Sequence, residues 1–206
     1  MKSSELLANV SRETSERLDI FAALLQKWNR TVNLVSPASL PDLRDRHFKD
    51  SAQIWGLCHP AEGHWLDIGS GGGFPGLIVA ILAAGAGSAL QTTLVESDHR
   101  KAAFLRTVAL ETGLSVDIKI ARVEDLSPQS ADILSARALA PLSQLLEWTN
   151  RHRKPDGVAL FPKGRTVHKE VEAAQATWKF NHVAHQSRTD PQARILEIGA
   201  LNRVRA

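Results

Sequence analysis

Hydrophobic residues recur at helical spacing through the first part of the chain. One set of apolar positions, separated by charged residues, predicts a helix that ends near Trp28: Leu6, Leu7, Val10, Leu18, Phe21, Leu24, Leu25 and Trp28. A second helical pattern starts near Asp42 and continues through Leu43, Phe48, Ile54 and Leu57. We therefore expect the chain to open with a helical extension over residues 1–60.

From residue 61 onward the pattern changes to short apolar runs that alternate with helical segments. The runs predict strands at 65–68, 90–95, 116–120, 132–135, 157–161, 180–185 and 194–201, and the segments predict helices at 100–111, 141–150 and 167–176. This alternation is typical of an α/β fold, with a mostly parallel sheet covered by helices on both faces. The last two strands follow each other without a helix between them, so they predict an antiparallel edge.

Size and composition suit one domain. The 206 residues allow an α/β unit with a modest appendage, and a hydrophobic content of 43% is enough for a core. The single cysteine, Cys58, excludes an internal disulfide framework and a cysteine-based zinc site. Residues 1–19 are rich in charge and lack the apolar segment of a signal peptide, and no apolar run approaches the ~20 residues of a membrane span. We expect a soluble, cytoplasmic protein.

The strand at 65–68 runs into Gly69-Ser70-Gly71-Gly72-Gly73-Phe74-Pro75-Gly76, which predicts a glycine loop and then a helix. Glycines let the backbone turn tightly and approach a ligand closely. Proline is favourable at a helix start, where its missing N–H would be unpaired in any case. Because open α/β sheets bind nucleotides at the carboxyl ends of their strands, this loop predicts a cofactor site. The alternative is a tight turn without a ligand.

Two carboxylates decide which cofactor the loop suits. Residues 71–76 fit the dinucleotide pattern G-x-G-x-x-G, and Glu96 follows at the spacing of a ribose contact. A pyrophosphate, however, needs bare helix N–H groups and no nearby anion, whereas Asp67 stands at the strand end. S-adenosylmethionine (SAM) carries a sulfonium and an ammonium and no phosphate, so the Asp67 carboxylate favours SAM electrostatically. An NAD-dependent oxidoreductase is the distant alternative.

Several segments resemble one family in particular. The glycine loop is generic to SAM enzymes, but three other segments are more specific: W-N-x-x-x-N-L over residues 28–34, R-H-x-x-D-S over residues 46–51 and A-R-A over residues 136–138. Glu96-Ser97, Arg100 to Leu105, Ala121 to Glu124 and Lys163-Gly164 occur in the same order. The chain is identified on these motifs as similar to the bacterial small-subunit ribosomal RNA guanine-N7 methyltransferases (RsmG, also called GidB). The resemblance covers about residues 24–165, and no motif is recognised beyond Val167.

This resemblance implies a fold, a reaction and a set of cofactor contacts. The fold would be a Rossmann-like, class I SAM-dependent methyltransferase with a seven-stranded sheet. Residues 1–206 would form one methyltransferase domain, with a helical extension at 1–60 and a SAM-binding core at 61–206. The reaction would be transfer of a methyl group from SAM to N7 of one guanine in 16S rRNA, with S-adenosylhomocysteine as product. The expected cofactor-binding residues are Asp67, Gly69, Gly71, Phe74, Glu96, Val123, Glu124 and Arg137.

The chemistry requires little beyond positioning. Guanine N7 is a lone-pair nucleophile with no proton to lose, so we assign no catalytic acid or base. Positioning alone can supply about 7–11 kcal/mol in well-oriented systems. Arg137 and Lys163 are the candidates for positioning groups. Arg137 follows a strand end and can hold a carboxylate bidentately, either that of SAM or that of a neighbouring aspartate.

Charge points to the RNA side of the protein. The net charge is +3, yet residues 151–169 hold six Lys or Arg side chains and one Asp. A positive field in one stretch suits contact with phosphates; a solvated surface is the alternative. The expected RNA-binding residues are Arg46, His47, Arg151, Arg153, Lys154, Lys163 and Arg165. Protein groups cannot reach N7 in the deep groove of A-form RNA, so the target base must be unpaired or splayed out.

The expected partner is 16S rRNA or the 30S subunit, bound by a monomer without a metal or a membrane. A SAM-dependent methyltransferase with another RNA or a small molecule as substrate is the main alternative. Trp28 fits either stacking on a base or closure of the apolar face of the first helix, and the sequence favours closure. Asp50 and Ser51 are suited to tying the extension to the glycine loop.

Overall fold

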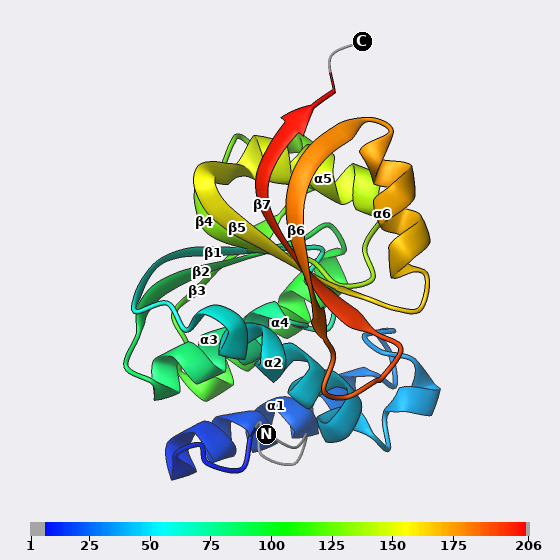
Figure 1. Cartoon of the computed structure of the whole chain (residues 1–206). Coiled ribbons are helices and arrows are strands. Elements are labelled where there is room, and N and C mark those ends of the chain that lie inside the picture. The colour runs from blue at the N-terminus through cyan, green and yellow to red at the C-terminus, as the bar shows by residue number, and fades with distance from the viewer. Residues whose placement is uncertain (1–6, 205–206) are drawn as a thin grey trace.

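The computed structural model describes residues 7–204, so Leu6 of the first predicted helix lies outside the described part. Its centre is one seven-stranded sheet in the order β3-β2-β1-β4-β5-β7-β6 (Figure 1). The strands are β1 Glu62–Ile68, β2 Ala89–Glu96, β3 Val116–Ile120, β4 Ala131–Ser135, β5 Arg153–Lys163, β6 Trp178–Gln186 and β7 Arg194–Arg203. Neighbouring strands from β3 to β5 pair in parallel, and β7 pairs antiparallel with both β5 and β6. The predicted α/β fold with an antiparallel C-terminal edge is confirmed.

Helices cover both faces of this sheet. The helices α1 Arg12–Trp28, α2 Lys49–Cys58, α3 Gly76–Gly85 and α4 His99–Thr112 lie below it in Figure 1, and α5 Leu142–His152 and α6 Val167–Gln175 lie above it. In β1, Trp65 is buried on the first face, whereas Leu66 and Ile68 are buried on the second. Side chains of successive strand residues point to opposite faces, so a strand covered on both sides reads as a continuous apolar run. In the part of the chain that the structure describes, no helix is long and apolar enough to cross a membrane.

The helical extension packs directly against the glycine loop. Phe21 of α1 stacks on Phe74 of the loop with ring centroids 5.3 Å apart, and on Phe48 at 5.1 Å. A Cβ atom added at Gly73 would lie 3.0 Å from the Phe21 ring, which is tighter than ordinary contacts. The loop therefore owes part of its shape to helices that precede it in the chain.

The extension also holds itself in a defined path after α1. The Asn29 side chain accepts the backbone N–H groups of Leu34 and Val35 and donates to the Val35 carbonyl. Trp28 packs against Phe104 of α4 with ring centroids 5.8 Å apart, which confirms the packing role that the sequence favours. A turn of π-helix, Leu43–Phe48, then runs straight into α2. The W-N and R-H segments thus shape the path of the extension toward the carboxyl ends of the parallel strands.

Candidate functional site

A cavity of about 460 Å³ lies at the carboxyl ends of β1 and β2, beside the glycine loop; we call it the glycine-loop cavity. Its lining includes every predicted cofactor residue except Asp67: Gly69, Gly71, Phe74, Glu96, Val123, Glu124 and Arg137. Its volume is within the range of small-molecule sites. That these residues contact a cofactor stays a prediction, but the fold does bring them to one place.

Most amides of the glycine loop are already bonded within the protein. Ser70, Gly73 and Phe74 donate to backbone carbonyls. The Gly71 N–H donates to Glu96 Oε2 at 2.8 Å, and the Asp98 N–H donates to Glu96 Oε1 at 2.8 Å. A pyrophosphate would find few bare N–H groups here and a carboxylate beside it, so the loop suits a cofactor without phosphate. Each Glu96 oxygen keeps a second lone pair that can accept a ribose hydroxyl.

The prediction that the Asp67 carboxylate faces a cationic ligand is wrong. Asp67 is fully buried, where its Oδ1 accepts the Ser135 hydroxyl at 2.7 Å and its Oδ2 accepts the Gly76 N–H at 3.2 Å. Burial raises the pKa of this carboxyl to about 6, although those hydrogen bonds oppose the rise. Asp67 therefore ties the start of α3 to β4 from beneath the loop. Period-two alternation explains the error, because Asp67 shares the face of Trp65 and lies under α3.

Val123 and Glu124 form the far wall of the glycine-loop cavity. Residues Val123–Asp125 form a short 3-10 turn after β3, and the first amides of such a turn have no partner inside it. The buried His152 ring bonds the Val123 carbonyl at 3.1 Å and so fixes the turn. Val123 is buried, which suits an apolar wall of an adenine site. Glu124 is exposed, which suits a hydrogen-bonding group at the edge of that site.

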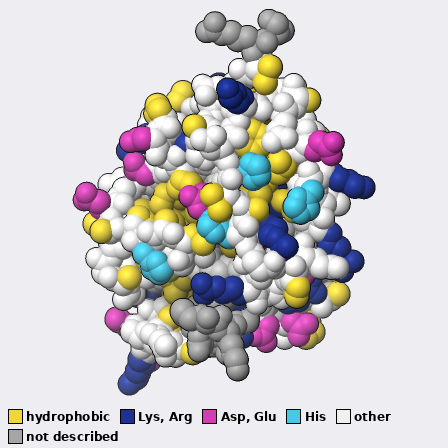
Figure 2. Space-filling model, in the orientation of Figure 1, with side chains coloured by type: hydrophobic (Ala, Val, Ile, Leu, Met, Phe, Trp, Pro, Cys, Tyr) yellow, Lys and Arg dark blue, Asp and Glu magenta, His cyan; other side chains and the backbone are white. Residues whose placement is uncertain are grey.

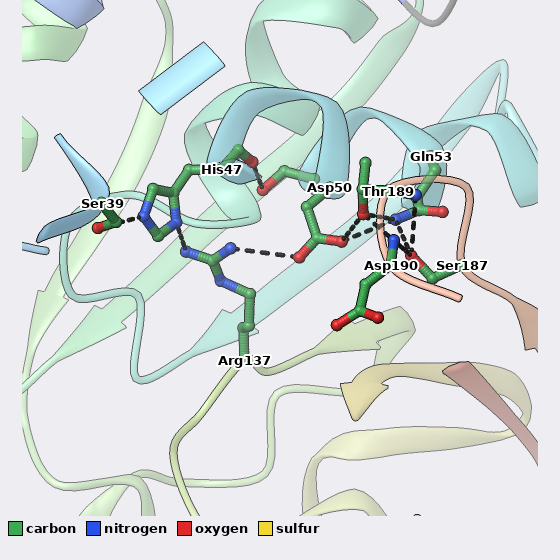
Figure 3. A network of polar contacts seen from close by, with 9 residues as sticks. Ser39, His47, Asp50, Gln53, Arg137, Ser187, Thr189 and Asp190 are labelled. Atoms are coloured by element: carbon green, nitrogen blue, oxygen red, sulfur yellow. Dashed lines mark hydrogen bonds and ion pairs between the residues drawn. The ribbon is translucent and has the colours of Figure 1, made fainter. Parts of the chain in front are cut away.

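Arg137 connects the end of β4 with the helical extension (Figure 3). Its Nη2 donates to His47 Nδ1 at 2.7 Å, and its Nη1 lies 3.4 Å from Asp50 Oδ2. The guanidinium carbon also lies 5.0 Å from the centroid of the Phe74 ring. Of the two partners expected for this guanidinium, the structure shows the neighbouring aspartate. Asp50 thus ties the extension to the end of β4, rather than to the glycine loop as predicted.

The Arg137 contact fixes the state of His47. A guanidinium has no acceptor, so His47 Nδ1 must accept and Nε2 must carry the proton, which it donates to Ser39 Oγ at 2.9 Å. Burial, followed by the charges of Arg137 and Arg46, lowers the pKa of His47 to about 4. At neutral pH His47 is therefore uncharged and links Arg137 to Ser39, and its contact with RNA stays a prediction.

A second cavity of about 740 Å³ adjoins the first; we call it the tail cavity because residues 187–195 form part of its wall. Arg137, Ala138 and Leu139 line both cavities and so form the partition between them. Ala138 has a positive φ of 52°, which is unusual for alanine and marks a tightly constrained turn. The Leu139 side chain covers Gly69, where an added Cβ would come within 2.5 Å of Leu139 Cδ1.

Lys163 lines the tail cavity, but its ammonium group is already paired with a carboxylate of the protein. Its side chain is only 10% exposed, and its Nζ donates to Glu170 Oε2 at 2.8 Å and to the Ala140 carbonyl at 3.0 Å. Because the ammonium is already held in an ion pair, the structure does not favour Lys163 as a phosphate contact, and its contact with RNA stays a prediction. Through Ala140 it supports the partition between the cavities, which agrees with a positioning role.

The basic stretch 151–169 does not form one patch. β5 begins at Arg153 rather than at residue 157, so it separates Arg153 and Lys154 from Lys163 by about 30 Å of extended chain. At the far end, Arg151 bonds the Leu126 carbonyl, Arg153 bonds the Gly157 carbonyl and Lys154 pairs with Asp132. The prediction that these three join Arg165 in one RNA-binding surface is wrong. On the face seen in Figure 2, cationic side chains likewise lie at several separate places.

The sequence analysis did not identify several residues that line the cavities, because they lie in segments without a recognised motif. Leu139 and Trp148 line the glycine-loop cavity, and Asp190 and Arg194 line the tail cavity. A turn-forming Asp-Pro pair at 190–191, between two predicted strands, was the one available sign of the last wall. Among residues 7–204, no three His, Cys, Asp or Glu side chains are grouped as a metal site requires.

Comparisons with known proteins agree with this geometry. The family model described as rRNA small subunit methyltransferase G matches residues 14–196. The ribosomal RNA small subunit methyltransferase G of Ruegeria pomeroyi is 52% identical over 196 residues, which cover 95% of this chain and 96% of that protein. A TehB-like SAM-dependent methyltransferase from Corynebacterium glutamicum has a TM-score of 0.59 at 13% identity, with 89% of this chain and 99% of that chain covered. M. jannaschii TYW2 in complex with AdoMet has a TM-score of 0.54 at 14% identity, with 77% and 76% covered.

The buried Asp67 makes a pH-dependent prediction for Asp67→Asn. Because the folded-state pKa is raised from 3.8 to about 6, burial of the carboxyl has no pH-dependent cost below about pH 4, and the fold loses stability progressively as pH rises from there to about 6. Asparagine keeps an acceptor for Gly76 and cannot ionise. The unfolding free energy of the variant relative to wild type should therefore rise by about 3 kcal/mol between pH 4 and pH 7 in urea titrations.

SAM affinity measured by calorimetry should change only a few-fold in Asp67→Asn, because the side chain does not line the glycine-loop cavity. A stability difference that is independent of pH would show that the carboxyl is not desolvated. Loss of SAM binding in a folded variant would show that the Asp67 carboxylate contacts SAM directly, as the sequence suggested.

Proposed function

The chain belongs to the rRNA small subunit methyltransferase G family, and from that membership we propose that it transfers the methyl group of SAM to N7 of one guanine in 16S rRNA. The observation that carries the proposal is the pair of adjoining cavities at the carboxyl ends of the parallel strands, separated by Arg137, Ala138 and Leu139. A methyl donor on one side of this partition and an acceptor base on the other are near neighbours. The family's chemistry needs that arrangement.

We assign SAM to the glycine-loop cavity. Glu96 accepts the ribose hydroxyls, Val123 and Glu124 hold the adenine, and Gly69 and Gly71 allow the loop to approach the ligand. Phe74 contributes through the loop, since its buried ring packs on Phe21 and lies beneath Arg137. When bound, SAM supplies an electrophilic methyl group on a sulfonium. The internal bonding of the loop amides supports SAM over a dinucleotide.

The target guanine enters the tail cavity, whose volume suffices for a nucleoside. N7 attacks with its own lone pair and releases no proton, so the protein contributes orientation and exclusion of water rather than a base. Arg137 and Lys163 act as positioning residues: each is fixed by a carboxylate, Asp50 for the first and Glu170 for the second. Both hold the segment that separates donor from acceptor.

Two exposed arginines near the tail cavity are assigned to the RNA backbone. Arg46 lines the cavity, and Arg165 follows β5 beside Gly164, which also lines it. The surface offered by one small domain is too limited to read a long sequence. We therefore propose that a folded region of the 30S subunit presents the splayed base to a monomeric enzyme in the cytoplasm.

Removing both exposed arginines should weaken RNA binding through the salt-dependent part of the affinity. In Arg46→Ala with Arg165→Ala, the log–log slope of affinity against salt should fall by about two, roughly one unit per lost phosphate contact. Lys154→Ala is the matched control, because Lys154 lies at the opposite end of β5 and pairs with Asp132. Binding to 30S subunits across a salt series measures both. An equal slope for double variant and wild type would remove these arginines from the interface.

The chemical step should need no base. Single-turnover methyl transfer to unmodified 30S subunits at saturating SAM should be nearly flat between about pH 6.5 and 9, since N7 has no proton to lose. His47, with a pKa of about 4, does not titrate in this range. A rate that rises steeply with one pKa near neutrality would mean that a proton is removed, and N7 of guanine would then not be the acceptor.

A further inference from the structure

Three carboxylates line the tail cavity, and in two of them both oxygens accept hydrogen bonds from the protein. Asp50 accepts from Arg137, Thr189 and Gln53 through its two oxygens. Glu170 accepts from Lys163 and the Leu142 N–H through Oε2 and from Thr166 through Oε1. Asp190 differs from both. Its Oδ1 accepts the Gln192 N–H at 2.8 Å, and its Oδ2 has no partner among the residues that the structure describes.

The loop that carries Asp190 is held firmly by buried polar groups. Gln53 of α2 is 4% exposed, and its amide bonds Ser187 Oγ at 3.2 Å and the Arg188 N–H at 3.0 Å. Thr189 Oγ1 donates to Asp50 at 2.8 Å, so the same carboxylate that pairs with Arg137 also anchors this loop. In Figure 3 the Asp190 carboxylate is directed away from Gln53 and Ser187. The loop is positioned, and the exposed Asp190 side chain keeps one carboxylate oxygen that can accept a hydrogen bond from a ligand.

Guanine offers the matching chemistry. N7 and O6 are acceptors along one edge, while N1–H and the N2 amino group are donors along the Watson–Crick edge. A base whose N7 faces the partition with the glycine-loop cavity must present its donor edge to another part of the wall. Asp190 lines the tail cavity and not the glycine-loop cavity. Adenine in the same pose would present the N1 lone pair to a carboxylate, which is repulsive.

Resting on the proposed function, we infer that Asp190 is the residue that selects guanine, by accepting hydrogen bonds from N1–H and the N2 amino group of the target base. Methylation of N7 makes the ring cationic, so these donors become stronger as the methyl group is transferred. The Asp190 contact is therefore tighter in the transition state than in the bound ground state, and it contributes to kcat as well as to KM. The C-terminal hairpin, which carries no recognised motif, supplies the specificity.

The first test is methyl transfer to unmodified 30S subunits by Asp190→Asn. The asparagine oxygen still accepts the Gln192 N–H, so the loop is retained, but its NH₂ group opposes the donor edge of guanine. We expect kcat/KM to fall about 10- to 100-fold, the effect of losing a hydrogen bond to a charged group, while SAM affinity stays unchanged. Asp156→Asn is the matched control, because Asp156 is an exposed carboxylate at the far end of β5. Equal activity of the two variants would overturn the inference.

The second test asks whether Asp190 touches the base. In 30S subunits reconstituted with ligated 16S rRNA, inosine at the target position removes the N2 amino group and keeps N1, O6 and N7. Wild type should prefer guanine to inosine about tenfold, and Asp190→Ala should lose this preference. If Asp190→Ala keeps the wild-type preference, the residue acts on the loop and not on the base. If wild type transfers no methyl group to guanine-containing subunits, the proposed function itself fails, and that outcome is separate.

Discussion

The rest of this site depends on the contacts of the Arg137 guanidinium, which is largely buried in a side chain that is 17% exposed. A charge removed from water must be compensated, and Arg137 is compensated by groups from elsewhere in the chain: Asp50 at 3.4 Å, His47 at 2.7 Å and the face of Phe74. Two of these groups belong to the helical extension and one to the glycine loop. The contacts of Arg137 therefore join the end of β4 to the helical extension and to the glycine loop, and Arg137 is itself part of the partition between the two cavities.

The same contact explains why the extension and the C-terminal hairpin both matter to a site that lies on the parallel strands. Asp50 bonds Arg137 on one side and Thr189 on the other, so one carboxylate links the partition to the β6–β7 loop. Gln53 continues this link to Ser187. A reaction that needs no proton transfer depends strongly on holding donor and acceptor in line. A set of fixed polar contacts across three segments is what such a reaction requires of its protein.

The architecture was predictable because its signal is repeated. Apolar runs and helical segments alternate through residues 61–206, and each agrees with its neighbours, so small errors at their ends do not change the topology. The glycine loop and Glu96 could be recognised from the sequence, because a glycine-rich loop followed at that spacing by a carboxylate is typical of a nucleotide-type cofactor site. Asp67 was misassigned since its place in the strand, just before the loop, does not reveal which face it occupies. Period-two alternation puts it on the face of Trp65, but only the structure shows that α3 covers this face.

Charge was the least predictable property. Six cationic residues within residues 151–169 suggested one positive field, but β5 extends back to Arg153 and places them toward opposite ends of the strand. Two of them, Lys154 and Lys163, are also paired with carboxylates. Linear clustering says little about a surface when a strand runs through the cluster. Asp190 could not be identified from the sequence either, because its importance also depends on which side chains lie around it. Its significance lies in lacking a partner while its neighbours have them, and partners are visible only in three dimensions.

The most direct test of the central claim is a map of N7-methylguanosine in 16S rRNA from cells that lack this gene, with and without the wild-type gene restored. We expect a single N7-methylguanosine that is absent without the gene and returns with it. Its return should fail when the restored gene encodes Arg137→Ala, because donor and acceptor are then no longer held across one partition. An N7-methylguanosine pattern that is identical in all of these cells would show that the protein does not methylate N7 of a guanine in 16S rRNA.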